Sequence, residues 1–173
     1  NGKIISCKST ASVFGKYAGG IAGRNSSGKC SIYGCYNEGV IETDGGNAGG
    51  IYGKDDGFDF DIKGCYNIGT VQGRQGGEVL GAITSSSASG SSVMASCYVR
   101  EKYAIAHATE ETVFGSSGWP TSTNNTVWYA DPSNDGTYTA GSDGVPTGNY
   151  KFWKSLGSWN GGTPEYPKLW WEE

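Results

Sequence analysis

Apolar and polar positions recur at a nearly constant interval over the first hundred residues. Four cysteines lie 28, 30 and 32 residues apart, each with a large apolar residue three positions before it and a small residue directly before it. The cysteines are Cys7, Cys35, Cys65 and Cys97, the apolar residues are Ile4, Ile32, Ile62 and Met94, and the small residues are Ser6, Gly34, Gly64 and Ser96. Regular alternation along a strand would put cysteine and isoleucine on opposite faces. We therefore expect a bend or bulge at the small residue that turns both columns inward.

The residues after the cysteine predict a corner and a second strand. Asn37 and Gly39, and Asn67 and Gly69, have turn chemistry, because Asn bonds its own backbone and Gly supplies a positive φ. A short β-type run follows each pair, GVIET in one copy and GTVQG in the next.

A second phrase predicts a third strand, out of phase with the first. It reads AGGIAG, AGGIYG and GGEVLG, and ends at Gly23, Gly53 and Gly81. Polar loops of unequal length separate it from the next cysteine phrase. Three short strands in about 30 residues, without helical periodicity, are typical of one triangular coil of a parallel β-helix. We expect an all-β fold, a short right-handed parallel β-helix of about four coils over residues 1–108.

Composition narrows the classes of partner. The 30 glycines and the 17% share of charged residues suit tightly packed strands and corners, and the 13% share of aromatic residues argues against disorder. Because 13 Lys and Arg face 17 Asp and Glu, nucleic acid is not expected as a partner. No stretch approaches the roughly 20 apolar residues of a membrane span. No signal peptide is evident either, so a fragment or a mature form is expected.

The in-register cysteines are expected to be core residues. Neighbouring copies would lie about 4.8 Å apart, within reach of a disulfide, but their parallel Cβ vectors favour unpaired thiols packed as small hydrophobes. Cys30 stands outside the column and either pairs elsewhere or stays free.

These phrases resemble the GLUG repeat of bacterial proteins, in which a G-x-I-x-x-C-Y-N-x-G segment alternates with a G-G-I-x-G segment. GKIISCKS, IYGCYNEGVI, AGGIAG, IKGCYNIGTV and AGGIYG carry the match over roughly residues 2–106. The resemblance implies a large secreted or surface-exposed bacterial protein. Examples are an adhesin-like protein or the non-catalytic region of an immunoglobulin-A-cleaving metallopeptidase.

Residues 109–173 differ in character and are expected to form a tryptophan-rich C-terminal capping region. All six tryptophans lie here, and the closing stretch resembles the tail that often follows GLUG arrays. Bulky aromatics could close the last open edge of the stack. Exposed Trp faces could instead bind sugar, and both roles could hold for different residues. The candidate ligand-binding residues are Trp153, Trp159, Trp170 and Trp171.

Candidate catalytic groups are present, but their pattern favours a non-enzymatic protein. Parallel β-helices that cut acidic polysaccharides need paired carboxylates or a metal with a base. The candidates are Asp55, Asp56, Asp59, Asp61, Glu110 and Glu111. Alternation puts Asp59 and Asp61 on one face of a half-exposed strand. The only histidine is His107, which excludes an HExxH zinc site in this chain.

No cofactor is predicted, and calcium is the one that the sequence leaves open. Residues 131–136, DPSNDG, share three positions with a calcium-binding loop, but Ser142 stands where the bidentate glutamate belongs. A turn begun by Asp131 and Pro132 explains the same letters. The acidic loop at residues 54–61 is the rival calcium site.

We expect a non-enzymatic adhesion or display module of the bacterial surface or extracellular space, which binds a host or matrix glycan or protein. The alternative is a self-assembling, fibre-forming subunit, because the first coil leaves its edge open for end-to-end stacking on another copy. A polysaccharide-active enzyme is the least favoured hypothesis.

Overall fold

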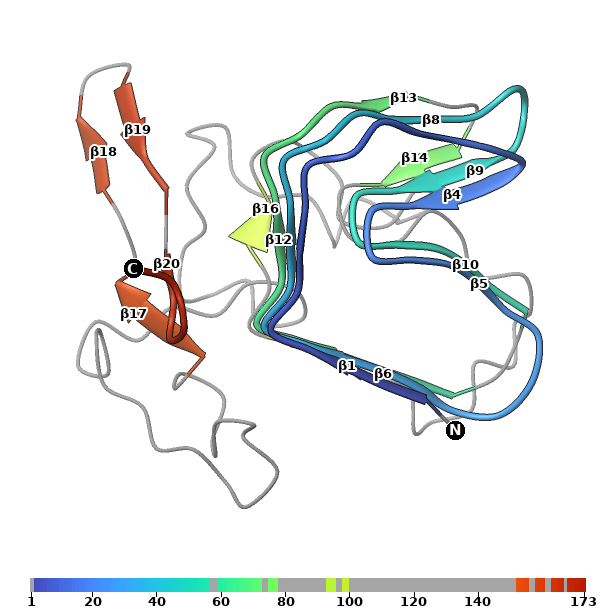
Figure 1. Ribbon diagram of the computed structural model, residues 1–173, viewed down its shortest axis with the longest axis horizontal. Coiled ribbons are helices and arrows are strands. Elements are labelled where there is room, and N and C mark those ends of the chain that lie inside the picture. The colour runs from blue at the N-terminus through green and yellow to red at the C-terminus, as the bar shows by residue number, and fades with distance from the viewer. Residues whose placement is uncertain are drawn as a thin grey trace.

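The computed structural model describes residues 2–56, 59–72, 75–77, 93–95, 98–99, 152–155, 158–160, 163–166 and 168–173. These residues form short β-strands joined by turns, with no helix among them (Figure 1). The expected boundary between residues 108 and 109 lies outside the described residues. So do Cys97, His107, Glu110, Glu111 and the candidate calcium loop at residues 131–136.

Two successive stretches of about 30 residues each form five strands in the same order. The first repeat, residues 2–29, holds β1 (Gly2–Ile5), β2 (Lys8–Ser9), β3 (Val13–Phe14), β4 (Tyr17–Gly19) and β5 (Ala22–Asn25). The second, residues 30–59, holds β6 (Cys30–Tyr33), β7 (Tyr36–Asn37), β8 (Ile41–Glu42), β9 (Asn47–Gly49) and β10 (Tyr52–Asp55). The third begins with β11 (Phe60–Lys63), β12 (Tyr66–Asn67), β13 (Val71–Gln72) and β14 (Gln75–Gly77), and β15 (Val93–Ala95) and β16 (Tyr98–Val99) follow.

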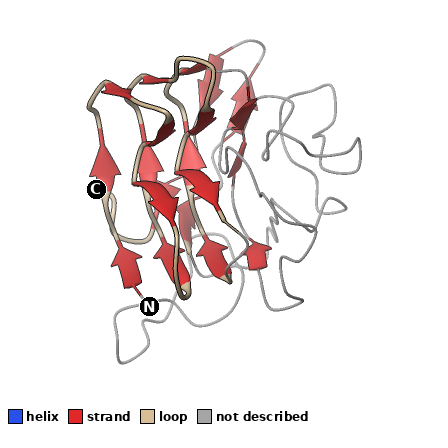
Figure 2. Ribbon diagram, turned by 90° about the vertical axis from the view of Figure 1, so that its right-hand side faces the viewer, coloured by secondary structure: helices blue, strands red, loops and turns tan. Residues whose placement is uncertain are grey.

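Equivalent strands of successive repeats pair in parallel, so the chain builds five small parallel sheets. Their orders are β1-β6-β11-β15, β2-β7-β12-β16, β3-β8-β13, β4-β9-β14 and β5-β10. The register follows the sequence repeat, with Ile32 opposite both Ile4 and Ile62 and aligned through Ile62 with Met94. Figure 2 shows the strands of successive repeats side by side.

Five strands per repeat replace the three that the sequence predicted, partly because the Gly-Gly phrase contains a sharp turn. In the first repeat this phrase contributes the end of β4 and the start of β5 instead of one strand. A Cβ atom on Gly19 would overlap the carbonyl oxygen of Ala22, and one on Gly20 would overlap that of Gly50. Only glycine allows the chain to fold back this closely on itself and on the next repeat.

The expected bend is confirmed before the three column cysteines that the structure describes, Cys7, Cys35 and Cys65. Ser6, Gly34 and Gly64 all have a positive φ, between 54° and 57°. As a result, Ile32 and Cys35 are both fully buried, although residues three positions apart in a regular strand would lie on opposite faces. Ile62 and Cys65 are buried in the same way in the third repeat.

As predicted for the cysteine column, Cys7, Cys35 and Cys65 form no disulfide, and Cys35 and Cys65 are buried in the core. Cys30, whose pairing the sequence left open, forms no disulfide either. The Sγ atom of Cys35 accepts a hydrogen bond from the backbone N–H of Cys7 at 3.4 Å, and that of Cys65 accepts one from Cys35 at 3.5 Å. The sulfur column therefore links consecutive repeats through N–H···S contacts.

The predicted Asn-Gly turn forms, but its glycines do not have the positive φ that we expected. No positive φ occurs at Gly39 or Gly69. A Cβ atom on Gly39 would overlap the carbonyl oxygen of Ala11, and one on Gly69 would overlap that of Gly39, so close stacking of the repeats is the reason for glycine.

The asparagines of the two Asn-Gly turns form a buried ladder. Asn37 bonds the backbone of Gly39 through both its amide nitrogen and its amide oxygen, each at 3.1 Å. The same nitrogen donates to Oδ1 of Asn67 at 2.8 Å, and Asn67 in turn bonds the carbonyl oxygen of Gly69 at 2.9 Å. Both asparagines are fully buried, so these bonds offset the cost of removing their amides from water.

The described part of the tryptophan-rich region forms four short strands in antiparallel pairs. These strands are β17 (Trp153–Ser155), which pairs with β20 (Lys168–Leu169), and β18 (Ser158–Asn160), which pairs with β19 (Thr163–Glu165). The tail was expected to close the last open edge of the stack. Its described side chains contact the second and third repeats at Gly34, Tyr36, Gly64 and Tyr66, and closure of the last edge stays a prediction.

Candidate functional site

We define the corner as the left-handed residues Ser6, Gly34 and Gly64, which connect β1 to β2, β6 to β7 and β11 to β12. The aromatic tail, which comprises the described residues from Phe152 onward, packs against this corner. A Cβ atom on Gly34 would overlap the Trp170 ring, and one on Gly64 would overlap Phe152. Each of these two glycines therefore leaves a space that one aromatic side chain of the tail fills. Phe152, Leu169 and Trp170 belong to the same hydrophobic cluster as Ile32 and Ile62, so the tail extends the core.

Stacked tyrosines beside the corner provide the second contact with the tail. The rings of Tyr36 and Tyr66 stack with centroids 4.7 Å apart and planes 5° apart, and Trp171 stacks on Tyr36 at 5.6 Å. The indole nitrogen of Trp171 donates to the carbonyl oxygen of Gly34 at 2.7 Å. The Tyr66 hydroxyl donates to Glu172 at 2.9 Å. Burial, followed by the nearby Glu172 carboxylate, raises the pKa of Tyr66, so this phenol is neutral.

The structure brings two of the four candidate tryptophans together, at the corner. Trp170 is only 8% exposed and Trp171 is half-buried. For Trp153 and Trp159 the structure describes the backbone, which pairs with Leu169 in one case and Pro164 in the other. Sugar binding by these residues stays a prediction, and for Trp170 the packing role accounts for the described contacts.

Two of the candidate catalytic carboxylates are each held by cations. Asp56 follows β10 and pairs with Lys54 at 2.9 Å and with Arg24. Asp61 lies in β11, where Lys63 Nζ is 3.1 Å from its Oδ1 atom. Hydrogen bonds from Lys54 and then Arg24 hold the pKa of Asp56 below its usual value. A general acid needs a raised pKa, so the environment of Asp56 favours a structural or ligand-binding carboxylate.

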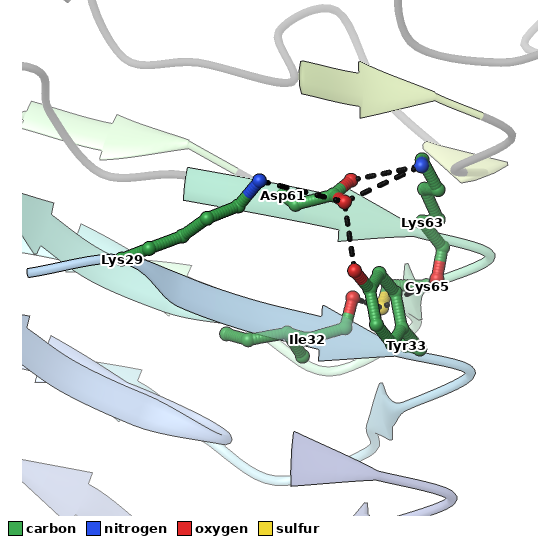
Figure 3. A network of polar contacts seen from close by, with 6 residues as sticks. All are labelled: Lys29, Ile32, Tyr33, Asp61, Lys63 and Cys65. Carbon is green, nitrogen blue, oxygen red and sulfur yellow. Dashed lines mark hydrogen bonds and ion pairs between the residues drawn. The ribbon is translucent and has the colours of Figure 1, made fainter. Parts of the chain in front are cut away.

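The first cluster of interest, the Tyr33 cluster, consists of Tyr33, Asp61, Lys63, Lys29 and Lys3. Figure 3 shows Tyr33, Lys63 and Lys29 around the Asp61 carboxylate. The Tyr33 hydroxyl donates to Oδ2 of Asp61 at 2.7 Å, and Lys63 donates to the same oxygen at 3.3 Å. Lys29 lies 4.0 Å from this oxygen, and Lys3 lies 6.0 Å from the centroid of the Tyr33 ring. Asp61 is only 8% exposed and lies between the buried residues Phe60 and Ile62, so the half-exposed strand expected here is wrong.

The second, the Tyr17 cluster, consists of Tyr17, Lys16, Arg24, Lys54 and Asp56. Its three cations lie over one ring, with Lys54 at 4.5 Å, Arg24 at 5.0 Å and Lys16 at 5.5 Å from the Tyr17 centroid. Cations are attracted to the face of an aromatic ring at such distances. Sequence reasoning missed this cluster, although a signal was present, because a basic residue directly follows the second phrase in both AGGIAGR and AGGIYGK.

Neither cluster contains a metal-binding set. Among the residues that the structure describes, no three His, Cys, Asp or Glu side chains are grouped so that they could hold a metal ion. Asp56 and Asp61, which belong to the rival calcium loop, each pair with a lysine in the structure, and Asp61 also accepts a hydrogen bond from the Tyr33 hydroxyl. The described part of the chain also contains no helix that is long and apolar enough to cross a membrane.

Comparison of the chain with family models, with curated proteins and with solved structures found no match. The candidate functional features are therefore defined by the geometry alone. They are the corner with its aromatic tail and the two tyrosine-centred clusters on the outer surface.

Proposed function

We propose that this chain is a non-enzymatic adhesion or display module of a bacterial surface or secreted protein, built as a short right-handed parallel β-helix. The parallel pairing of residues 28 to 30 positions apart supports the β-helix, because each repeat stacks on the one before it. The cysteine and Gly-Gly phrases support kinship with GLUG-repeat proteins, and with it a location outside the cell.

The observation that carries the proposal is the alignment of surface side chains from different repeats on one buried frame. Arg24 of β5 is in register with Lys54 of β10, and Tyr33 of β6 is in register with Lys63 of β11. The cysteine column and the asparagine ladder link successive repeats of this frame. Outer side chains can therefore vary without disturbing the stack, which is what a binding scaffold requires.

The proposed ligand is an extracellular glycan or a host or matrix protein. Tyrosine rings and long cations on the outer surface are groups that bind carbohydrate and protein partners. Because Trp170 is 8% exposed, we assign the contact to the Tyr17 cluster and to the half-buried Trp171.

A glycan array and an array of matrix proteins, probed with the labelled chain, test the proposal. We expect saturable binding to at least one ligand, without release of reducing ends or unsaturated products from any polysaccharide. Cleavage of a polysaccharide that is lost in Asp61→Asn would contradict the non-enzymatic function. The matched control, Asp44→Asn, changes an exposed carboxylate and should alter neither readout.

Self-assembly is the second candidate function, favoured by the open edges of the first repeat. Strands β1, β2, β3, β4 and β5 each lie at the edge of their sheet. Val13 and Ile4 are half-buried, whereas their partners Ile41 and Ile32 are fully buried, and Phe14 is 72% exposed. Unpaired strand edges of this kind template the addition of further strands.

Sedimentation velocity over a range of concentrations tests this candidate. The N–H groups of Val13 and Gly15 donate to the second repeat, so alternation turns the N–H of Phe14 toward the open edge. If copies associate through this edge, Phe14→Pro should abolish association while the fold is retained. A wild-type chain that stays monomeric at every concentration would contradict self-assembly.

A further inference from the structure

The Tyr17 cluster carries more positive charge than its own carboxylate neutralises. Lys16, Arg24 and Lys54 supply three cations around one ring, and Asp56 supplies one anion. The chain as a whole has a net charge of −4, so this concentration of positive charge is local.

The arrangement of the cluster has an electrostatic cost. Arg24 and Lys54 occupy directly opposed register positions on β5 and β10, about 4.8 Å apart along the stack. Like charges that face each other across neighbouring strands are destabilising. Asp56 offsets part of this repulsion because it bonds both residues, Arg24 Nε at 2.5 Å and Lys54 Nζ at 2.9 Å.

Part of the cluster is accessible to a ligand. The Arg24 side chain is 45% exposed and Lys16 is exposed, whereas the Lys54 side chain is only 12% exposed. Arg24 contacts Asp56 through Nε and Nη2, and its guanidinium group still belongs to a side chain that is nearly half exposed. A partly exposed arginine binds carboxylate or sulfate groups well, and a half-buried tyrosine ring beside it offers a flat apolar surface.

We propose that the Tyr17 cluster binds an acidic polysaccharide, with Arg24 and Lys16 contacting its carboxylate or sulfate groups and Tyr17 packing against a sugar ring. The positive charge of the cluster exceeds the charge that Asp56 neutralises, which suits a polymer with repeated negative groups. Asp56, which also bonds Lys54, holds Arg24 in place. This inference rests on the proposed adhesion function and names the chemical class of its ligand.

The Tyr33 cluster provides a matched comparison. It also combines one tyrosine, three lysines and one aspartate, but its cations lie farther from the ring, with Lys63 at 5.9 Å and Lys3 at 6.0 Å from the Tyr33 centroid. In addition, the Tyr33 hydroxyl is bonded to Asp61. Changing Lys3 and Lys29 there alters the net charge of the protein by the same amount as changing Lys16 and Arg24.

The test measures binding of three probes by biolayer interferometry: polygalacturonate, the neutral glucan dextran, and single-stranded DNA of matched charge. We expect saturable binding of polygalacturonate that weakens as salt rises, with at least about tenfold weaker binding of DNA and of dextran. The variant Lys16→Gln/Arg24→Gln keeps the Lys54 and Asp56 pair, and should lose about tenfold or more in affinity. The control Lys3→Gln/Lys29→Gln should lose less than about twofold.

Thermal unfolding of both double variants checks that the fold is retained. The inference is overturned if both variants lose affinity equally, if neither does, or if DNA binds as tightly as polygalacturonate. Should Lys16→Gln/Arg24→Gln fail to fold, Tyr17→Leu with polygalacturonate decides, because it keeps every charge and should still weaken binding. If polygalacturonate fails but the glycan or matrix array finds another ligand, the proposed function stands and this inference falls. If no ligand binds at all, both fall.

Discussion

Two residues of the corner, Gly34 and Gly64, have a left-handed backbone at positions where any side chain would overlap the tail. Gly34 and Gly64 have a φ of 57°, and both lie directly against aromatic rings of the tail. Gly45 has a similar φ of 72°, but nothing lies within 4 Å of the position of a Cβ atom there. These glycines therefore allow backbone strain and steric overlap to be measured separately.

We predict that Gly34→Ala destabilises the fold much more than Gly45→Ala. The left-handed backbone costs each variant roughly 1–2 kcal/mol in unfolding free energy. The clash with Trp170 adds roughly 1–3 kcal/mol for Gly34→Ala alone. Urea unfolding measures both values, and a Trp170→Ala background should remove the added cost. Equal losses for the two alanine variants would contradict the packing of Trp170 on Gly34.

The thiols of the cysteine column are predicted to differ in reactivity according to their depth. Cys7 and Cys30 are half-buried, whereas Cys35 and Cys65 are fully buried. Hydrogen bonding by Cys65 lowers the pKa of Cys35, so an accessible Cys35 would react quickly. We therefore expect iodoacetamide to label Cys7 and Cys30 about tenfold or more faster than Cys35 in the native protein, as measured by peptide mass spectrometry. Equal rates would contradict the buried column.

Among the strands, the sequence predicted the stacking well and the path of each repeat less well. The spacing of Cys7, Cys35 and Cys65 follows directly from the register of the sheets, and the bend at Gly34 follows from the odd separation of Ile32 and Cys35. The turn inside AGGIAG could not be predicted, because it depends on contacts of Gly20 with the next repeat.

The candidate site was harder to predict because it depends on residues that are distant in the sequence. Tyr17, Arg24 and Lys54 come from three different strands, and only the parallel register brings the last two side by side. Likewise, no local pattern indicates that Trp170 fills the space beside Gly34, 136 positions away in the sequence.

We predict that Asp56 contributes to the stability of the β5 and β10 pair at neutral pH. Lys54 and Arg24 lower its pKa in the folded protein, so folding favours the ionised carboxylate. This contribution is present above the usual aspartate pKa of about 4 and is lost as the pH falls through the lower folded-state value. The unfolding free energy of wild type should therefore drop more than that of Asp56→Asn between about pH 6 and about pH 2.5. Parallel curves for the two proteins would contradict the prediction.

For the molecule as a whole, the account rests on one relationship, the parallel stacking of residues about 30 positions apart. The core columns, the asparagine ladder, the corner that receives the tail and the alignment of Arg24 with Lys54 all require it. An antiparallel hairpin arrangement of the same strands would separate every one of these groups.

Methyl-resolved NMR of an isoleucine-labelled sample tests this stacking most directly. The account predicts nuclear Overhauser effects from the Ile32 methyl groups to those of both Ile4 and Ile62, because these residues face one another on adjacent parallel strands about 4.8 Å apart. Absence of both cross-peaks, together with contacts from Ile32 to residues of a neighbouring hairpin, would contradict the stacked architecture and the proposals built on it.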